Sequence, residues 1–81
     1  MSEVLVRYYA AVRHAVGITE EMMVTRTGLE GILDQLSGRS DEISTLVGRC
    51  VFLADGCHIA PNNQPLPEGC TVDILPPFAG G

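Results

Sequence analysis

The chain has 81 residues, of which 46% are hydrophobic, and its ten acidic and five basic residues give a formal net charge of -5. This length supports one domain with a single core. The acidic balance makes nucleic acid and anionic membrane surfaces poor partners, because both carry negative charge. The apolar runs are too short for a membrane span, and no basic segment followed by an apolar one opens the chain, so we expect a cytoplasmic protein.

The first elements alternate in hydrophobicity. Apolar residues recur at every second position over about residues 3–9 and again over 21–25, which predicts two strands. Between them, residues 10–16 contain helix formers and end at Gly17, which predicts a short helix or turn. The two strands therefore form a predicted antiparallel pair.

The main helix begins after Thr27. The run Thr27-Gly28-Leu29-Glu30 has the spacing of a capping box, in which the side chains of the first and last residues bond each other's backbone N–H groups. An apolar stripe with helical spacing follows and ends at Gly38, so we expect it to face the core. Its members are Leu29, Ile32, Leu33 and Leu36.

A second helical turn follows Ser40, which stands before Asp41 and Glu42 as a serine cap before an acidic first turn. Further along, residues 49–54 are rich in strand formers, and Asp55-Gly56 is a strong two-residue hairpin signal. Residues 57–60 provide the predicted return strand.

The last strand is predicted over residues 71–75. Residues 61–65 form a loop before it, and Pro67-Glu68-Gly69 is expected to form a type I turn into it. Pro76 and Pro77 lack the N–H groups that a central strand needs, so the strand should stop there.

Residues 76–81 are therefore predicted to form an extended, flexible tail on a domain of residues 1–75. Six extended residues span roughly 20 Å, and the paired prolines favour a semi-rigid base. Gly80 and Gly81 carry no side chains, so the terminal carboxylate could enter a narrow channel in another protein.

Two strands, one main helix and three further strands describe an α+β fold, with a mixed sheet of about five strands and the helix across one face. The ubiquitin-like β-grasp fold fits this order. By analogy with that fold, the first and last strands should lie parallel and adjacent at the sheet centre, which would launch the tail from the most rigid part of the domain.

The three cysteines, Cys50, Cys57 and Cys70, are odd in number and show no C-x-x-C spacing. We therefore expect neither a metal site nor a disulfide framework. Cys57 and His58 are neighbours on a predicted strand and should point to opposite faces, which argues against a catalytic pair. His14 and His58 are expected to be surface or structural residues, and the chain is not expected to be an enzyme by itself.

The opening VLVRYYAAVR (residues 4–13), with Gly17, and the closing LPEGCTVDILPPFAGG (residues 66–81) resemble the small subunit of molybdopterin synthase, a MoaD-like member of the MoaD/ThiS sulfur-carrier family. The resemblance covers nearly the whole chain and is most specific in the closing Pro-Pro-x-x-Gly-Gly. His14 departs from the acidic residue that is common there, and Phe78 is bulkier than the usual aliphatic residue.

The resemblance implies that Gly81, next to Gly80, is adenylated by a ubiquitin-activating-like adenylyltransferase that uses ATP. A sulfurtransferase persulfide then converts it to a thiocarboxylate. The tail would donate sulfur to a cyclic pterin monophosphate in the large subunit, in a heterotetramer of two small and two large subunits, and two such transfers form the molybdopterin dithiolene. No cofactor would be bound permanently, and the reaction would belong to molybdenum cofactor biosynthesis.

Other functions fit the same tail. A ThiS-like carrier for thiamine thiazole, or for another sulfur pathway, is one alternative. A ubiquitin-like modifier joined to target lysines is another. The connection at residues 10–13 and the extra turn near Asp41 favour the molybdopterin subunit, because thiamine carriers are generally shorter there.

Strand alternation also predicts a docking face. If Val4, Val6 and Tyr8 face the helix, then Leu5, Arg7 and Tyr9 of the first strand and Asp73 and Leu75 of the last face the other way. Arg7 and Asp73 could pair, whereas the apolar residues of this face indicate a partner surface. The predicted partner-binding residues are Tyr9, Leu75, Leu5, Phe78, Pro76 and Pro77.

Overall fold

The structure, a computed structural model, describes residues 1–77. It contains five strands and three helices in the order β1-α1-β2-α2-α3-β3-β4-β5. The bounds are Ser2–Tyr8 (β1), Ala10–Val16 (α1), Glu20–Thr25 (β2), Gly28–Ser37 (α2), Asp41–Val47 (α3), Val51–Ala54 (β3), Cys57–Ile59 (β4) and Thr71–Leu75 (β5). Each predicted element is present, with ends that differ from the prediction by at most two residues.

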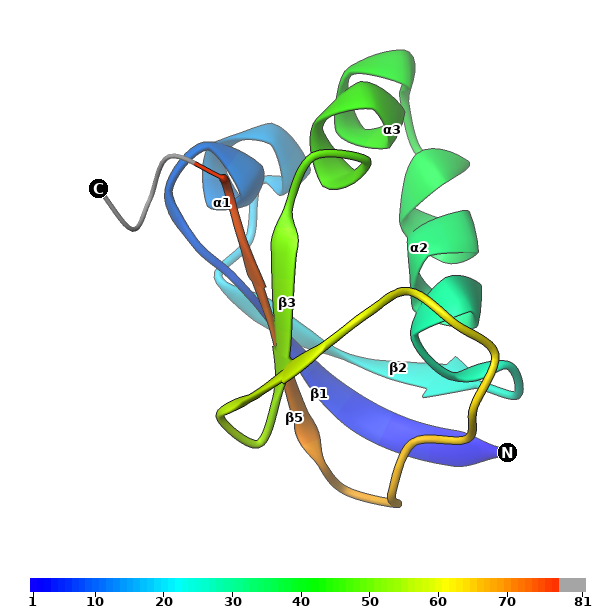
Figure 1. Ribbon diagram of the computed structural model, residues 1–81. Helices are drawn as coiled ribbons and strands as arrows, with labels where there is room; N and C mark the ends of the chain where they lie inside the picture. Colours follow the sequence, from blue (N-terminus) through cyan, green and yellow to red (C-terminus); the bar gives the residue numbers. More distant parts are fainter. Residues whose placement is uncertain (78–81) are drawn as a thin grey trace.

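The five strands form one mixed sheet in the order β2-β1-β5-β3-β4 (Figure 1). The β1 and β5 strands are parallel neighbours, whereas β1–β2, β3–β5 and β3–β4 are antiparallel. This confirms the predicted α+β class and the parallel pairing of the first and last strands. Because β5 is the middle strand of the order, the chain reaches Pro76 from the centre of the sheet.

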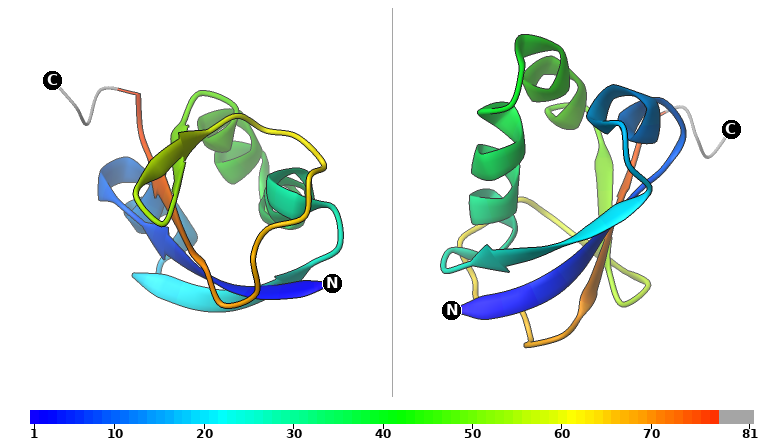
Figure 2. Two further views of the ribbon diagram at one scale, coloured as in Figure 1. Left: turned by 60° about the horizontal axis from the view of Figure 1, so that its bottom comes forward. Right: turned by 180° about the vertical axis from the view of Figure 1, so that it is seen from behind.

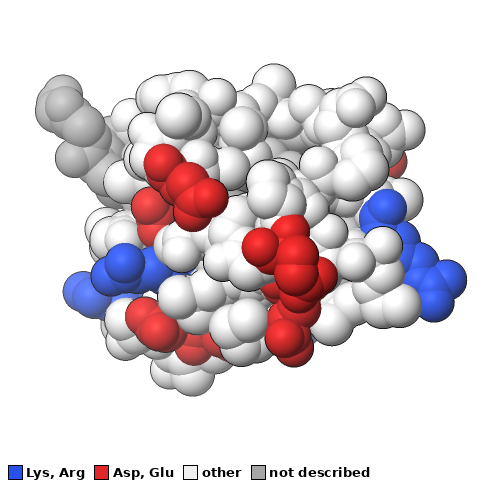
Figure 3. Space-filling view, turned by 90° about the horizontal axis from the view of Figure 1, so that it is seen from below, with Lys and Arg blue, Asp and Glu red and all other residues white. Residues whose placement is uncertain are grey.

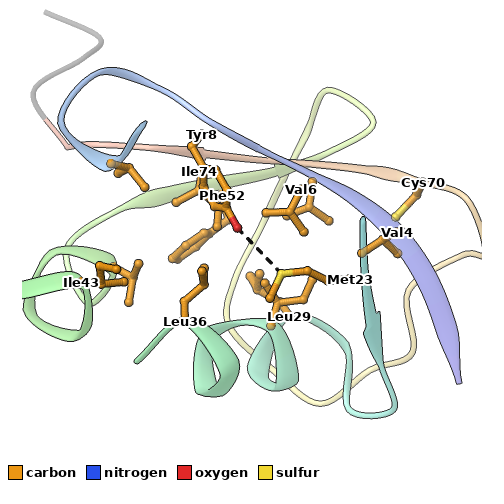
Figure 4. Close-up of a cluster of buried hydrophobic side chains, with 14 residues drawn as sticks. Val4, Val6, Tyr8, Met23, Leu29, Leu36, Ile43, Phe52, Cys70 and Ile74 are labelled. Carbon is orange, nitrogen blue, oxygen red and sulfur yellow. Dashed lines mark hydrogen bonds between the residues drawn. The ribbon is translucent and has the colours of Figure 1, made fainter. Parts of the chain in front are cut away.

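All three helices lie on the same side of the sheet, as the views from two further directions show (Figure 2). The space between the layers is filled by apolar side chains from every helix and from β1, β2, β3 and β5 (Figure 4). The inward residues of the two central strands are Val4, Val6, Tyr8, Val72 and Ile74, and each is at most 1% exposed. The predicted inward face of the sheet is therefore confirmed.

The predicted capping box at the start of α2 is wrong. Thr27 occupies the cap position, but among the described residues its side chain accepts no capping hydrogen bond. The Thr25 hydroxyl instead donates to the Gly28 carbonyl at 2.7 Å, and the Glu30 N–H donates to the Asn62 carbonyl at 3.1 Å. The helix start is satisfied by a loop distant in sequence, which local spacing cannot reveal.

Of two further local predictions, the Ser40 cap is confirmed and the type of the turn before β5 is wrong. Ser40 caps α3 as expected, because its Oγ accepts from the Ile43 N–H at 3.1 Å. The turn into β5 is type II and not type I: Cys70 N–H donates to the Pro67 carbonyl at 3.2 Å, and Gly69 between them has a φ of +79°. A positive φ at this position is what a type II turn requires and glycine supplies.

A polar network joins the sheet to the segment between α2 and α3. The buried Tyr8 hydroxyl donates to Glu21 Oε2 at 2.5 Å, and Arg39 contacts both Glu21 oxygens at 2.7 and 2.8 Å. Arg39 lowers the pKa of the Glu21 carboxyl by hydrogen bonding, and burial raises the pKa of Tyr8 above its usual range. The network keeps a carboxylate charged at the edge of the core.

Candidate functional site

The candidate site is the end of β5 and the residues that follow it. Leu75 lies between β1 and β3 and is opposite Val51 of the β3 strand. Pro76 is less than 2% exposed, so the first of the two prolines is packed into the domain, and Pro77 is the first exposed residue after the strand. Residues 78–81, which include the predicted site residues Phe78, Gly80 and Gly81, lie outside the described residues.

The outward face of β1 and β5 brings the three predicted apolar docking residues onto one side of the sheet. Leu5, Tyr9 and Leu75 are each half-buried. Leu5 lies between Met22 of β2 and Thr71 of β5 in the strand register. The side chains of this face point away from the three helices.

The polar residues of this face pair differently from the prediction. Arg7 and Asp73 are opposite one another in the β1–β5 register, but Arg7 Nε lies 3.7 Å from Glu20 Oε1. Asp73 Oδ1 instead accepts a hydrogen bond from the Tyr9 hydroxyl at 3.1 Å. The Arg7 guanidinium lies 5.9 Å from the centre of the Tyr9 ring, a distance typical of a cation–π contact.

Three contacts thus position Tyr9 beside the end of β5: a backbone hydrogen bond, a hydroxyl hydrogen bond and the cation–π contact. Its backbone N–H donates to the Ile74 carbonyl at 3.3 Å, which extends the β1–β5 pairing past the end of β1. Partial burial, followed by the hydrogen bond to Asp73, raises the pKa of the Tyr9 hydroxyl. The ring is therefore a neutral, fixed surface beside the point where the chain departs.

Sequence reasoning missed the part that β3 plays in this face. Leu53 is opposite Asp73, and Val51 is opposite Leu75, so both project on the same side as the predicted docking residues. Both are half-buried. Alternation within residues 49–54 indicates that Val51 and Leu53 share one face of a strand. Only the pairing of β3 with β5 shows that this face lies beside Leu75.

Charge is unevenly distributed over this side of the molecule. Figure 3 views the protein from below, away from the helices of Figure 1, and shows acidic side chains near the middle and basic ones toward two opposite margins. On the left of this view acidic and basic side chains lie close together, and uncharged surface occupies much of the rest. The half-buried Leu5 and Leu75 add apolar surface to this side of the sheet.

A groove of about 750 Å³ lies between α1 and α3, on the helical side of the sheet. His14 lies along it and is exposed, as is His58 on β4. The groove is lined by Ala11, His14, Ala15, Asp41, Glu42, Thr45, Leu46 and Arg49. It belongs to the opposite layer from Leu5 and Leu75, so it is separate from the candidate site.

The cysteines occupy three different environments. Cys70 is buried, Cys50 is half-buried with its thiol donating to the Leu46 carbonyl at 3.2 Å, and Cys57 is exposed on β4. Burial raises the pKa of Cys50 to about 11 and raises that of Cys70 as well. Two of the three thiols are therefore poor nucleophiles at neutral pH.

Within residues 1–77, no three His, Cys, Asp or Glu side chains gather closely enough to hold a metal ion. The helices in that part of the chain are also too short or too polar to cross a bilayer.

Three solved structures resemble this chain over nearly all of its length. The small archaeal modifier protein 1 from Methanosarcina acetivorans has 22% identity and a TM-score of 0.80, with 100% of this chain and 98% of that one covered. A putative molybdopterin converting factor subunit 1 from Pyrococcus furiosus has 22% identity and a TM-score of 0.78, covering 96% and 100%. A complex of subunits 1 and 2 of that factor from Helicobacter pylori contains a chain with 22% identity and a TM-score of 0.74, covering 98% and 99%.

These likenesses confirm the predicted ubiquitin-like β-grasp fold, although their low identities carry no further assignment. No curated protein sequence matches the chain significantly. The sequence model of the ThiS family, in contrast, matches residues 6–81, which include the end of β1, all the later elements and the terminal glycines. The chain therefore belongs to the ThiS family, in which the ThiS and MoaD proteins are grouped.

Proposed function

We propose that this protein is a sulfur carrier that serves as the small subunit of a molybdopterin synthase, with the Gly81 carboxyl group as the carrier site. The observation that carries the proposal is the family match, which continues through Gly81 instead of ending with the folded domain. The position of β5 supports it. A strand held between β1 and β3, with Pro76 buried behind it, gives the terminal segment a fixed root.

The chemistry begins with activation of the carboxylate. A terminal carboxyl group has an unperturbed pKa of about 3.3–3.7, so it is ionised at neutral pH and can attack the α-phosphate of ATP. Pyrophosphate leaves, and an acyl-adenylate forms. A persulfide sulfur on a sulfurtransferase then displaces AMP, and cleavage of the sulfur–sulfur bond by a thiol reductant leaves the thiocarboxylate.

The adenylyltransferase supplies the ATP site, so this chain needs no permanent cofactor. Its own contribution is to present the reacting end and to be recognised. Recognition is assigned to the face of Tyr9, Leu5 and Leu75, with Pro76, Pro77 and Phe78 leading to the glycines. Activation with ATP is expected to occur in the cytoplasm.

The acceptor is proposed to be a cyclic pterin monophosphate held by a large subunit, which supplies the catalytic side chains. The Helicobacter pylori structure, a complex of subunits 1 and 2 of a molybdopterin-converting factor, supports a partner of this kind. Two loaded carriers on a dimer of large subunits would form a heterotetramer. Two sulfur transfers then complete the dithiolene that binds molybdenum.

Mass spectrometry of the intact protein tests the carrier function. The full chain is incubated with a ThiS-family activating enzyme, ATP and a persulfide donor, and then with a large subunit and the cyclic pterin. We expect a mass gain equal to the exchange of one oxygen for sulfur, and its loss when the pterin acceptor is added. A chain that is never thiolated would overturn the carrier proposal, whereas thiolation without transfer to the pterin would place the carrier in another pathway, such as thiamine thiazole synthesis.

A ubiquitin-like modifier is the second candidate. The high structural similarity to the small archaeal modifier protein 1, with a TM-score of 0.80, favours it. Modification would join Gly81 to a lysine of another protein, because this chain contains no lysine. Adducts that resist thiol reductants in cell extracts, and that disappear when Gly81 is deleted, would support the modifier and not the carrier.

A further inference from the structure

In the part of the chain that the structure describes, the strand β2 forms one edge of the sheet and pairs only with β1. The Tyr8 N–H donates to the Thr19 carbonyl at 2.9 Å, which fixes the hydrogen-bonding phase of the β1–β2 ladder. In an antiparallel pair the bonded positions alternate, so the backbone groups of Glu20, Met22 and Val24 point away from β1. The Val24 carbonyl confirms this direction, because it accepts from Gln35 Nε2 of α2 at 2.8 Å.

The side chains of this edge are unusually apolar for exposed positions. Met22 is 53% exposed and Val24 is 46% exposed, and both project from the outward face of the sheet. An exposed edge with apolar side chains pairs readily with another strand unless charge or shape prevents it. The opposite edge, β4, has only three residues and offers little backbone for pairing.

We propose that β2 pairs antiparallel with β2 of a second copy of this chain, about a two-fold axis that passes beside Met23. In this register Met22 is opposite Val24 of the second copy, and their outward backbone groups bond each other. Glu20 is then opposite Arg26 of the second copy. Both contacts occur twice, because the axis repeats them.

The order of residues 20–26 is self-complementary, and this identifies the strand that pairs with β2 as β2 of a second copy. An acidic residue at the start of the strand and a basic residue just after its end are brought together only by antiparallel pairing. Opposite charges and apolar pairs at facing positions stabilise neighbouring strands, whereas like charges there destabilise them. A shift of the axis by one residue to Met22 would place Glu20 opposite Val24 and lose the charge pairing.

The local charge also permits this contact, despite the overall charge of -5. Three of the five arginines lie at or next to β2. Arg7 lies 3.7 Å from Glu20, Arg39 lies 2.7 Å from Glu21, and Arg26 follows the strand. The acidic residues of β2 are therefore already balanced before a second copy approaches.

Gln35 does not block the contact, because the Val24 carbonyl has two lone pairs and can accept a second hydrogen bond. The pairing joins the two sheets into one continuous sheet of ten strands. Only one strand from each copy takes part, so the interface is small and the dimer should dissociate on dilution.

Sedimentation equilibrium of the full chain over a wide range of concentrations tests the proposal, together with hydrogen exchange of individual amides. We expect a monomer–dimer equilibrium, and slower exchange of the Met22 and Val24 amides as dimer forms. Arg26→Glu should weaken the dimer about tenfold, because like charges then face each other twice. Glu20→Arg should do the same, and the double variant Glu20→Arg/Arg26→Glu should recover the affinity of the natural chain.

Arg49→Glu is the matched control for Arg26→Glu, since it changes the net charge equally but lies in the turn after α3, and it should leave the dimer unchanged. Met22→Pro removes an outward-facing N–H without breaking a β1–β2 bond and should prevent pairing. If that variant does not fold, the charge exchange still decides the question. A chain that stays monomeric at every concentration, a double variant that fails to recover, or an edge that binds only an extended peptide would overturn self-pairing.

Discussion

The Tyr9 hydroxyl donates to Asp73 Oδ1 at 3.1 Å, which ties the residue after β1 to the central strand β5. This bond fixes the Tyr9 ring beside the place where the chain leaves the sheet. If the ring contacts a partner, as proposed, the ring and the hydroxyl contribute separately, because the hydroxyl is already bound within the chain.

Removal of the apolar anchors should weaken recognition. We expect Tyr9→Ala and Leu75→Ala each to cost about 1–2 kcal/mol in binding to the large subunit and the activating enzyme, roughly tenfold in affinity, because anchors at an interface centre dominate binding. Calorimetric titration of the folded variants measures this effect.

Two control variants test whether a loss of affinity comes from the Tyr9 ring and from this face of the sheet. Tyr9→Phe keeps the ring and removes only the hydroxyl, so it should bind nearly as well as the natural chain. Ile18→Ala shortens an apolar side chain that is 44% exposed before β2, and it should change neither affinity. Equal affinities for all four variants would remove this face from the recognition site.

Deletion of Gly81 should abolish adenylation and leave thermal unfolding unchanged. The reason is that the reacting carboxylate is moved one residue back, while the packed domain, through Pro76, is untouched. ATP–pyrophosphate exchange with the activating enzyme reports the activation step. A shortened chain that still accepted sulfur would exclude the terminal-carboxylate mechanism.

The cysteines should be dispensable for sulfur transfer. We expect a variant with Cys50, Cys57 and Cys70 replaced by alanine to be loaded with sulfur normally, with some loss of stability from the buried Cys70 position. In the natural chain a maleimide should label Cys57 first, because burial raises the pKa of both other thiols. A well-folded triple variant that could not transfer sulfur would indicate a persulfide on one of them.

The strands and helices could be predicted because each carries a local signal. Alternation marked β1 and β2, the apolar stripe marked α2, and Asp55-Gly56 marked the β3–β4 hairpin, where the φ values are +48° and +84°. The inward face of β1 and β5 followed from the same alternation. What the sequence alone did not predict depends on contacts between distant segments.

Three examples show this limit. The start of α2 is satisfied by Asn62 and not by a local box, and Arg7 pairs with Glu20 and not with Asp73. Leu53 joins the outward face of β1 and β5 only because β3 pairs with β5. A residue's partner depends on which strands are neighbours and in which register, and that information is spread over the whole chain.

The Gly28 position should tolerate no side chain. Its φ is +60°, and a Cβ there would lie 1.9 Å from the Gln64 carbonyl oxygen, so the loop that closes over α2 would have to move. We expect Gly28→Ala to lower the free energy of unfolding by about 3 kcal/mol, from backbone strain and the clash together.

Gly17→Ala is the matched control. Its φ is +91°, but within residues 1–77 no atom beyond its two chain neighbours lies within 4 Å of the added Cβ, so the variant should cost only the strain of about 1–2 kcal/mol. Chemical denaturation of both variants makes the comparison. Equal losses would mean that the contact with the loop adds nothing to the strain.

The adjacent residues Glu20 and Glu21 should respond very differently to neutralisation. Glu21 is bound by Arg39 and by the buried Tyr8 hydroxyl, whereas Glu20 and Arg7 have side chains 47% and 45% exposed. We expect Glu21→Gln to lower the free energy of unfolding at neutral pH by about 1–2 kcal/mol, since it removes the charge from these hydrogen bonds. Glu20→Gln should cost less than about 0.5 kcal/mol, because an exposed pair contributes little.

The two variants should also differ in their dependence on pH. Arg39 lowers the pKa of Glu21 in the folded chain below the unfolded value of 4.5, so the stabilisation is present above that pH and is lost as pH falls through the folded pKa. The deficit of Glu21→Gln should therefore shrink in acid, while that of Glu20→Gln stays small throughout. Urea denaturation at a series of pH values measures both curves. A Glu21→Gln deficit that did not change on acidification would show that the carboxylate charge does not stabilise the fold.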